Sequence, residues 1–293
     1  MFCAYGSSLL RDTSPDAEAF KPIRERIEKN PIQGSPKDMR NAFARIAGAG
    51  PEGRTINIRG IRAVCHGTGP AALWLHGGGY VFGSPETHAT AAAFLARESG
   101  MTIILPDYRL APEHTWPAPL DDVLALLDDI ERPIPLIGDS AGGHLVINAA
   151  RYRPDAVSAL VAISANTDRT GLSTSRQAGQ DTNPMNNDED DISLARMSMP
   201  DVSFDHPDAS PILADLSGLP PTFVTASTRE VLLDDSLMLV RALGLAGVPV
   251  CADITHAPCH MWTLWPDRLA SASRTLKGIA AFLNTHTRTV RTQ

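Results

Sequence analysis

With 293 residues and 43% hydrophobic side chains, the chain is long enough to bury one sizeable α/β core, and its composition argues against wholesale disorder. Its formal net charge is −7 without a long block of lysine and arginine, which argues against a nucleic-acid partner or an anionic membrane surface. No run approaches the roughly 18 apolar residues of a membrane span. The four cysteines lack C-x-x-C spacing, and residues 1–10 lack the basic and apolar regions of a secretory signal, so we expect a soluble cytoplasmic protein.

The first 50 residues predict two short charged helices, over 16–29 and 36–47, separated by proline- and glycine-containing breaks. Such helices need a surface to pack on, and we expect residues 1–50 to form the N-terminal part of a helical lid. A catalytic domain is assigned to residues 51–293. It begins with extended segments over 55–64 and a buried parallel strand over 71–75.

Three consecutive glycines, Gly77 to Gly79, follow the strand over 71–75. Residues without side chains let backbone N–H groups approach a ligand oxygen closely. The same glycines would also suit a plain flexible turn. An oxyanion hole requires such donors beside a nucleophile, so the interpretation depends on what lies next to them.

Strand-like and helix-like segments alternate through the middle of the chain. We expect helices over 87–100, 117–129 and 141–151, and strands over 101–105, 134–138 and 157–164. This alternation is typical of an α/β fold with a doubly wound, mostly parallel sheet.

The segment Gly138-Asp139-Ser140-Ala141-Gly142 matches the G-x-S-x-G pattern at the junction between a strand and a helix. A serine on so tight a turn has a strained backbone, and its neighbours two residues away must be very small. The helix that follows favours developing negative charge at its N-terminus. The alternative is a glycine-rich loop that binds phosphate or merely turns, but the P-loop and G-x-G-x-x-G patterns are both absent. We predict that Ser140 is a nucleophile, and that the N–H groups of Gly78, Gly79 and Ala141 form an oxyanion hole.

A polar insertion over about 166–215 interrupts the alternation, and so long a connection is typical of a lid or a binding loop. Its acidic run, 188–191, is interpreted as a solvated face rather than a metal site, and a short helix is expected over 192–199. Regular structure then resumes with strands over 221–226 and 249–254 and helices over 235–246 and 268–283.

A serine nucleophile needs a base, which we assign to His260 on the loop after the last strand. His256 is the rival base. Together with Cys259, the two histidines could suggest a metal cluster, but the spacing lacks a third sensible ligand and no metal is expected. The other histidines, His144 among them, are interpreted as structural or surface groups.

The acid should follow the seventh strand, where Glu230 is the first carboxylate out of the strand. Asp234 and Asp235 are placed to cap the helix that follows. We therefore assign the acid to Glu230, with Asp234 as the alternative.

Together these motifs resemble the bacterial hormone-sensitive-lipase-like carboxylesterases of the α/β-hydrolase fold, over residues 70–285. The motifs are His76-Gly77-Gly78-Gly79, Asp107-Tyr108-Arg109-Leu110-Ala111-Pro112-Glu113 and Gly138-Asp139-Ser140-Ala141-Gly142-Gly143. The resemblance implies a central sheet of about eight strands, a lid built from residues 1–50 and 166–215, an oxyanion hole at the first motif and the nucleophile at the last. It aligns Glu230 with the family's catalytic Asp. It also matches His260-Met261-Trp262, but not His256-Ala257-Pro258, to the family's His-x-aromatic pattern.

The sequence thus predicts serine-dependent hydrolysis of carboxylic esters through an acyl-enzyme, with short-to-medium acyl or small apolar substrates and no cofactor. The site consists of Ser140, Glu230 and His260 as the catalytic triad and of Gly78, Gly79 and Ala141 as the oxyanion hole. The partner is a small-molecule ester, and a homodimer is left open. Two alternatives remain at this point: a lactone hydrolase with the same triad, and a non-catalytic receptor that keeps the fold.

Overall fold

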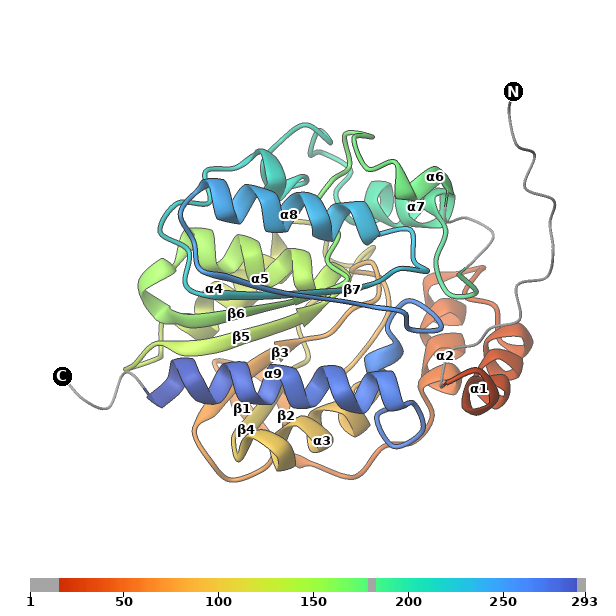
Figure 1. Ribbon diagram of the computed structural model, residues 1–293, viewed down its shortest axis with the longest axis horizontal. Coiled ribbons are helices and arrows are strands. Elements are labelled where there is room, and N and C mark those ends of the chain that lie inside the picture. Colours follow the sequence, from red (N-terminus) through yellow and green to blue (C-terminus); the bar gives the residue numbers. More distant parts are fainter. Residues whose placement is uncertain (1–15, 179–182, 289–293) are drawn as a thin grey trace.

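A central sheet of eight strands organises the computed structural model, which describes residues 16–178 and 183–288 (Figure 1). The strands are β1 (Arg54–Ile58), β2 (Ile61–His66), β3 (Ala71–Leu75), β4 (Thr102–Pro106), β5 (Ile134–Asp139), β6 (Val157–Ile163), β7 (Thr222–Ser227) and β8 (Val250–Thr255). Their order in space is β1-β2-β4-β3-β5-β6-β7-β8. β2 pairs antiparallel with β1 and β4, and all other neighbours are parallel. The predicted doubly wound, mostly parallel sheet is confirmed.

Helices cover both faces of the sheet (Figure 1). One face carries α3 (Ala89–Ser99) and α9 (Ala270–Arg288), and the other carries α4 (Ala118–Leu127), α5 (Ala141–Tyr152) and α8 (Leu233–Leu245). Each face has its own apolar core, because successive side chains of a strand point to opposite sides. On β3, Trp74 belongs to the core under α3 and α9, whereas Leu73 and Leu75 belong to the core under α4, α5 and α8.

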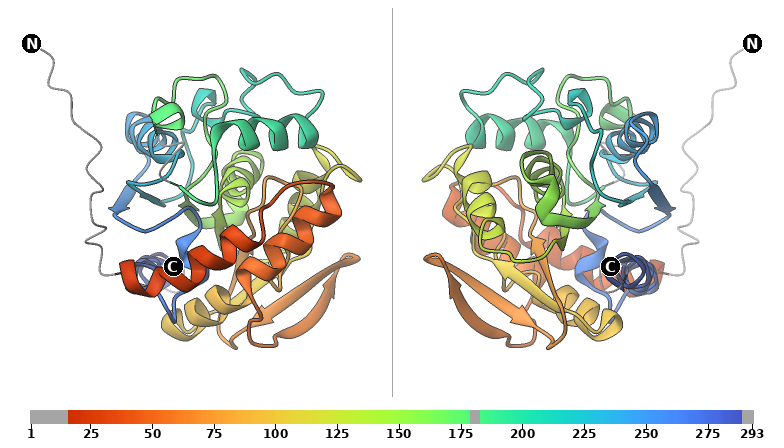
Figure 2. Two further views of the ribbon diagram at one scale, coloured as in Figure 1. Left: turned by 90° about the vertical axis from the view of Figure 1, so that its right-hand side faces the viewer. Right: turned by 90° about the vertical axis from the view of Figure 1, so that its left-hand side faces the viewer.

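Four further helices gather at one end of the sheet: α1 (Ala17–Lys29), α2 (Pro36–Ala47), α6 (Ser175–Ala178) and α7 (Asp188–Ser198) (Figures 1 and 2). The helices predicted at 16–29 and 36–47 are present. A capping box between Ser35 and Asp38 starts α2. Asp16 fixes the beginning of α1 to the main body, since its carboxylate accepts the N–H groups of Ala270 and Ser271 at the first turn of α9, at 2.6 and 3.1 Å. Residues 1–15 of the expected lid segment, with Cys3, lie outside the described residues.

The insertion departs from the sequence prediction at the acidic run. Helix α7 begins at Asp188 rather than at residue 192, because Asn187 caps it: its Oδ1 accepts the N–H of Asp190 at 2.8 Å. The acidic run is therefore the first turn of a helix, where negative charge complements the helix dipole. Its interpretation as a solvated face is wrong for Asp191, which is buried.

The remaining regular structure consists of three short 3₁₀ turns, at Pro154–Ala156, Pro211–Leu213 and Trp262–Leu264. Across the two described ranges, each helix is too short or too polar to traverse a bilayer.

Candidate active site

Ser140 occupies a tight turn between β5 and α5, with a φ of +53° that a residue with a Cβ rarely adopts. Two glycines make the turn sterically feasible. A Cβ on Gly138 would lie 2.1 Å from the carbonyl oxygen of Gly142, and a Cβ on Gly142 would lie 2.0 Å from that of Leu75. The Ser140 N–H donates to the Ile163 carbonyl of the neighbouring strand at 2.9 Å. The turn therefore holds Ser140 at the end of the sheet, facing a pocket.

The loops after β7 and β8 bring Glu230 and His260 together. His260 Nδ1 lies 2.6 Å from Glu230 Oε2, and both side chains are buried. The other carboxylate oxygen, Oε1, accepts the Ser164 hydroxyl at 2.7 Å and the Ser227 N–H at 2.6 Å. Glu230 thus has one oxygen fixed by the ends of two strands and the other aligned on the imidazole.

Asp234 and Asp235 do not cap α8, which begins at Leu233 without a side-chain cap, so that expectation is wrong. Asp234 accepts the Ser175 N–H at 2.9 Å, and Asp235 accepts the backbone N–H groups of residues 167 and 168 at 2.8 and 2.9 Å. Both carboxylates therefore secure the 166–178 segment.

His256, the rival base, is exposed, and its Nδ1 lies 2.7 Å from the Thr228 hydroxyl. Cys259 is buried next to His260, and burial raises the pKa of its thiol well above the ordinary value. Neither residue is among those that line the pocket with Ser140.

The loop after β3 places Gly78 and Gly79 at the same pocket as Ser140 and His260. Both have positive φ, +123° and +58°, and a Cβ on Gly78 would lie 2.2 Å from the carbonyl oxygen of Phe82. Within the described part of the chain, the N–H groups of Gly78, Gly79 and Ala141 donate to no protein acceptor. Three donors around a serine are the arrangement that a developing oxyanion requires.

The pocket lies between α2 and α7. Figure 2 (left) looks onto the end of the molecule where these helices lie. The apolar side chains that line the pocket are Ile32, Met39, Phe43, Phe82, Met185, Leu194 and Met261. The cavity thus presents an apolar wall to any group bound beside Ser140.

Asp139, the residue before Ser140, ties the nucleophile turn to the glycine loop. Its buried carboxylate accepts Trp74 Nε1 at 2.8 Å and the Gly77 N–H at 3.1 Å, and lies 3.1 Å from His88 Nε2. Burial raises the pKa of this carboxyl, but His88 and the Trp74 hydrogen bond outweigh it, so the pKa is lowered overall. Sequence reasoning did not assign Asp139 a role, although it stands inside the G-x-S-x-G segment.

Asn166, just beyond β6, is a second site residue that sequence reasoning missed. The Ser140 hydroxyl donates to Asn166 Oδ1 at 3.2 Å, and Asn166 Nδ2 donates to Asp191 Oδ1 at 2.6 Å. Ser140 is thereby connected to helix α7. The only sequence signal for Asn166 was its place just beyond strand β6, which ends at the site.

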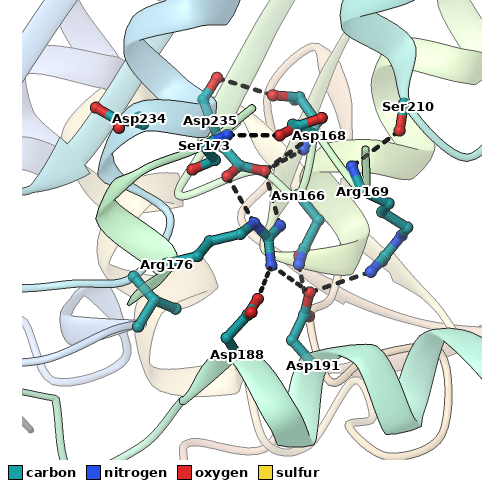
Figure 3. A network of polar contacts seen from close by, with 12 residues as sticks. Asn166, Asp168, Arg169, Ser173, Arg176, Asp188, Asp191, Ser210, Asp234 and Asp235 are labelled. Atoms are coloured by element: carbon teal, nitrogen blue, oxygen red, sulfur yellow. Dashed lines mark hydrogen bonds and ion pairs between the residues drawn. The ribbon is translucent and has the colours of Figure 1, made fainter. Parts of the chain in front are cut away.

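A buried ion-pair network, shown in Figure 3, holds α7 in place. Arg176 pairs with Asp235 at 2.9 Å, with Asp191 at 2.8 Å and with Asp188 at 3.2 Å, while Arg169 pairs with Asp191 at 3.1 Å. Burial raises the pKa of Asp191, but the two guanidinium groups outweigh it and hold the pKa at about 2. For Asp235 the effect of burial exceeds the opposing effect of Arg176 and of the backbone hydrogen bonds, so the pKa of this carboxyl is raised.

Comparison with known proteins is consistent with this geometry. A family model described as alpha/beta hydrolase fold matches residues 72–264. An acetyl-hydrolase of Streptomyces hygroscopicus is 32% identical over 229 residues, covering 75% of this chain and 77% of that protein. An esterase of Acinetobacter venetianus is 31% identical over 268 residues, covering 85% and 88%. The structure of an esterase from the bacterial hormone-sensitive lipase family superposes with a TM-score of 0.86 at 30% identity, covering 92% of this chain and 98% of the other.

The ion-pair network predicts a large stability effect at Arg176. Replacing Arg176 by Gln leaves Asp191 and Asp235 without their shared cation, and breaking a buried pair in this way costs about 3–5 kcal/mol. Urea unfolding monitored by circular dichroism measures the change. The matched control is Arg153→Gln, which removes an exposed pair with Asp128 and should cost at most about 1 kcal/mol. Equal losses in the two variants would contradict a special role for the network.

Proposed function

We propose a serine-dependent mechanism for this chain, which belongs to the alpha/beta hydrolase fold family and, within it, to the bacterial hormone-sensitive-lipase-like carboxylic ester hydrolases. The observation that carries the proposal is the 2.6 Å contact between Glu230 and His260 beside the pocket that contains Ser140. A hydroxyl nucleophile, an imidazole base and an orienting carboxylate are the three groups that acyl transfer by serine requires.

In the first step the Ser140 oxygen attacks the ester carbonyl carbon while His260 takes its proton. Because Nδ1 of His260 is engaged by Glu230, Nε2 is the nitrogen that accepts the proton. The Ser140 hydroxyl donates to Asn166 Oδ1, so a rotation of the Ser140 side chain redirects it to the imidazole.

The tetrahedral intermediate carries a negative oxygen, which the N–H groups of Gly78, Gly79 and Ala141 stabilise. Their positions are set by the glycine loop after β3 and by the first turn of α5. The N-terminus of α5 adds its favourable dipole.

Collapse of the intermediate expels the alcohol, which receives the proton from His260, and leaves Ser140 acylated. Water then attacks the acyl-enzyme while His260 takes one of its protons. His260 returns that proton to the Ser140 oxygen as the bond to the acyl group breaks, and the carboxylic acid departs. Glu230 stays ionised throughout and stabilises the imidazolium that forms in each half of the reaction.

The pocket favours esters with short-to-medium apolar acyl chains. Phe43, Met185 and Leu194 are among the apolar side chains that line it with Ser140. The relative named acetyl-hydrolase agrees with this preference.

The direct test of the nucleophile is covalent labelling. A fluorophosphonate probe should add to Ser140 in the wild-type protein, at a site identified by peptide mass spectrometry. Ser140→Ala should fold normally, escape the probe and lose hydrolysis of nitrophenyl acetate almost completely, with only residual catalysis from the remaining groups. Wild-type turnover by the folded variant would refute the assignment.

A second prediction concerns the acid. Glu230→Gln keeps the shape of the side chain but stabilises the wrong imidazole tautomer, which can lower turnover about 10⁴-fold. Asp234→Asn is the matched control, because Asp234 bonds the 174–175 segment and not the imidazole. It should retain wild-type turnover. An active Glu230→Gln beside a folded but inactive Asp234→Asn would transfer the role to Asp234.

A third prediction concerns acyl length. Leu194 of α7 lines the pocket beside Gly79, so Leu194→Ala should admit longer chains. Burial of one methylene is worth about 0.8 kcal/mol, so kcat/KM should rise about fourfold for each added carbon that the new space accepts. A series of nitrophenyl esters from acetate to octanoate measures this. Leu213→Ala, at an exposed leucine, should leave the series unchanged, and an unchanged series for Leu194→Ala would rule out this wall as the limit.

A further inference from the structure

Three consecutive residues of the glycine loop adopt positive φ: Gly78 at +123°, Gly79 at +58° and Tyr80 at +64°. Tyr80 has a Cβ, so this conformation is unfavourable for it and persists only where the surroundings impose it. Contacts with other parts of the chain must therefore hold Tyr80 in this conformation.

Contacts at both ends of the residue hold Tyr80 in place. Its carbonyl oxygen accepts the Ala111 N–H at 2.8 Å. Its side chain is 1% exposed, and the phenolic oxygen lies 2.6 Å from His144 Nδ1. The Trp116 ring packs edge-on against both partners, with ring centroids 5.8 Å from Tyr80 and 5.6 Å from His144.

Burial keeps both partners of this hydrogen bond neutral. Burial raises the pKa of Tyr80 well above its ordinary value, so the phenol keeps its proton. Burial, assisted by Arg169 and Arg151, lowers the pKa of His144 to about 3, so the imidazole is neutral. The 2.6 Å hydrogen bond therefore joins a neutral phenol to a neutral imidazole.

This bond joins the two chain segments that supply the oxyanion donors. Tyr80 directly follows Gly79 on the loop after β3. His144 lies one turn into α5, where its N–H donates to the Ser140 carbonyl at 3.1 Å, and Ala141 lies in the same turn. Gly79 adjoins Tyr80 in the chain, and Ala141 lies in the same helical turn as His144. A hydrogen bond that fixes the distance between Tyr80 and His144 therefore also fixes the distance between the amides of Gly79 and Ala141.

We propose that Tyr80 and His144 are positioning residues, whose hydrogen bond sets the spacing between the two halves of the oxyanion hole. This inference rests on the proposed function, because it assigns a role to that hole. Neither residue touches the substrate. Each acts through the donor next to it, so its loss should weaken binding of the transition state and leave binding of the substrate nearly unchanged.

Tyr80→Phe is the primary test, because it removes the hydroxyl and keeps the ring against Trp116. We expect kcat for nitrophenyl acetate to fall about 10- to 100-fold with KM within about threefold of wild type, since removal of a whole oxyanion donor costs 10²–10³-fold. Affinity for a trifluoromethyl ketone, whose adduct with Ser140 carries an oxyanion, should fall by the same factor as kcat/KM. An unchanged kcat, or a loss confined to KM, would overturn the proposal.

Tyr152→Phe is the matched control, because it removes a tyrosine hydroxyl bonded to Asp208 at the far end of the same helix. It should retain wild-type kcat and ketone affinity. Ser140→Ala distinguishes a failure of the serine mechanism from a failure of the positioning role. If that variant stays active, the serine mechanism fails; if it is inactive and Tyr80→Phe keeps full kcat, only the positioning role fails.

Substitutions at His144 test the same bond from the other side and do not depend on Tyr80→Phe folding. His144→Leu should reproduce the loss in kcat, whereas His144→Gln, whose amide oxygen can accept the phenol, should retain at least about a third of wild-type kcat. The double variant Tyr80→Phe/His144→Leu should be no slower than the slower single variant, because the two share one interaction. Equal kcat in the Leu and Gln variants would overturn the proposal.

Discussion

A Cβ on Gly142 would lie 2.0 Å from the Leu75 carbonyl oxygen, so α5 can begin beside β3 only because this residue lacks a side chain. That close approach places the end of β5, with Ser140, directly next to the glycine loop that leaves β3. In the proposed mechanism, the first amide of α5 and the amides of the loop stabilise the same oxyanion. The strained φ of Ser140 and the run of positive φ from Gly78 to Tyr80 lie on the two sides of this close approach.

The two helices that border the pocket are held by different forces. On α2, Met39 and Phe43 contribute apolar side chains, as expected for an amphipathic helix on a core. α7 adds buried charge to its apolar contacts, through Asp191 and the two arginines that neutralise it. Buried ion pairs contribute little net stability but tolerate few alternative arrangements. We therefore interpret the network as an arrangement that fixes the position of α7, and with it Asn166 and Ser140.

Most of the fold was predictable because its signals are local. The strand over 71–75 is an apolar run before glycines, and the site residues follow strand ends, where parallel strands bring them together. The unpredicted parts depend on contacts between distant segments. Nothing near Asp191 in the sequence reveals that Arg176 and Arg169 will surround it, and the roles of Asp234 and Asp235 depend on a loop some 60 residues earlier. The start of α7 was missed because a cap at Asn187 outweighed the polar, loop-like composition.

The acid at the candidate site is a glutamate where the resembled family has an aspartate, and the structure offers a physical account of how the longer side chain is used. The extra methylene adds a torsion, so a glutamate carboxylate is less constrained by its backbone. Here Oε1 is fixed by the Ser164 hydroxyl and the Ser227 N–H, from the ends of the adjacent parallel strands β6 and β7. With that oxygen anchored, the freedom of the added torsion is removed and Oε2 faces His260. The sheet itself, through two neighbouring strand ends, thus orients the carboxylate.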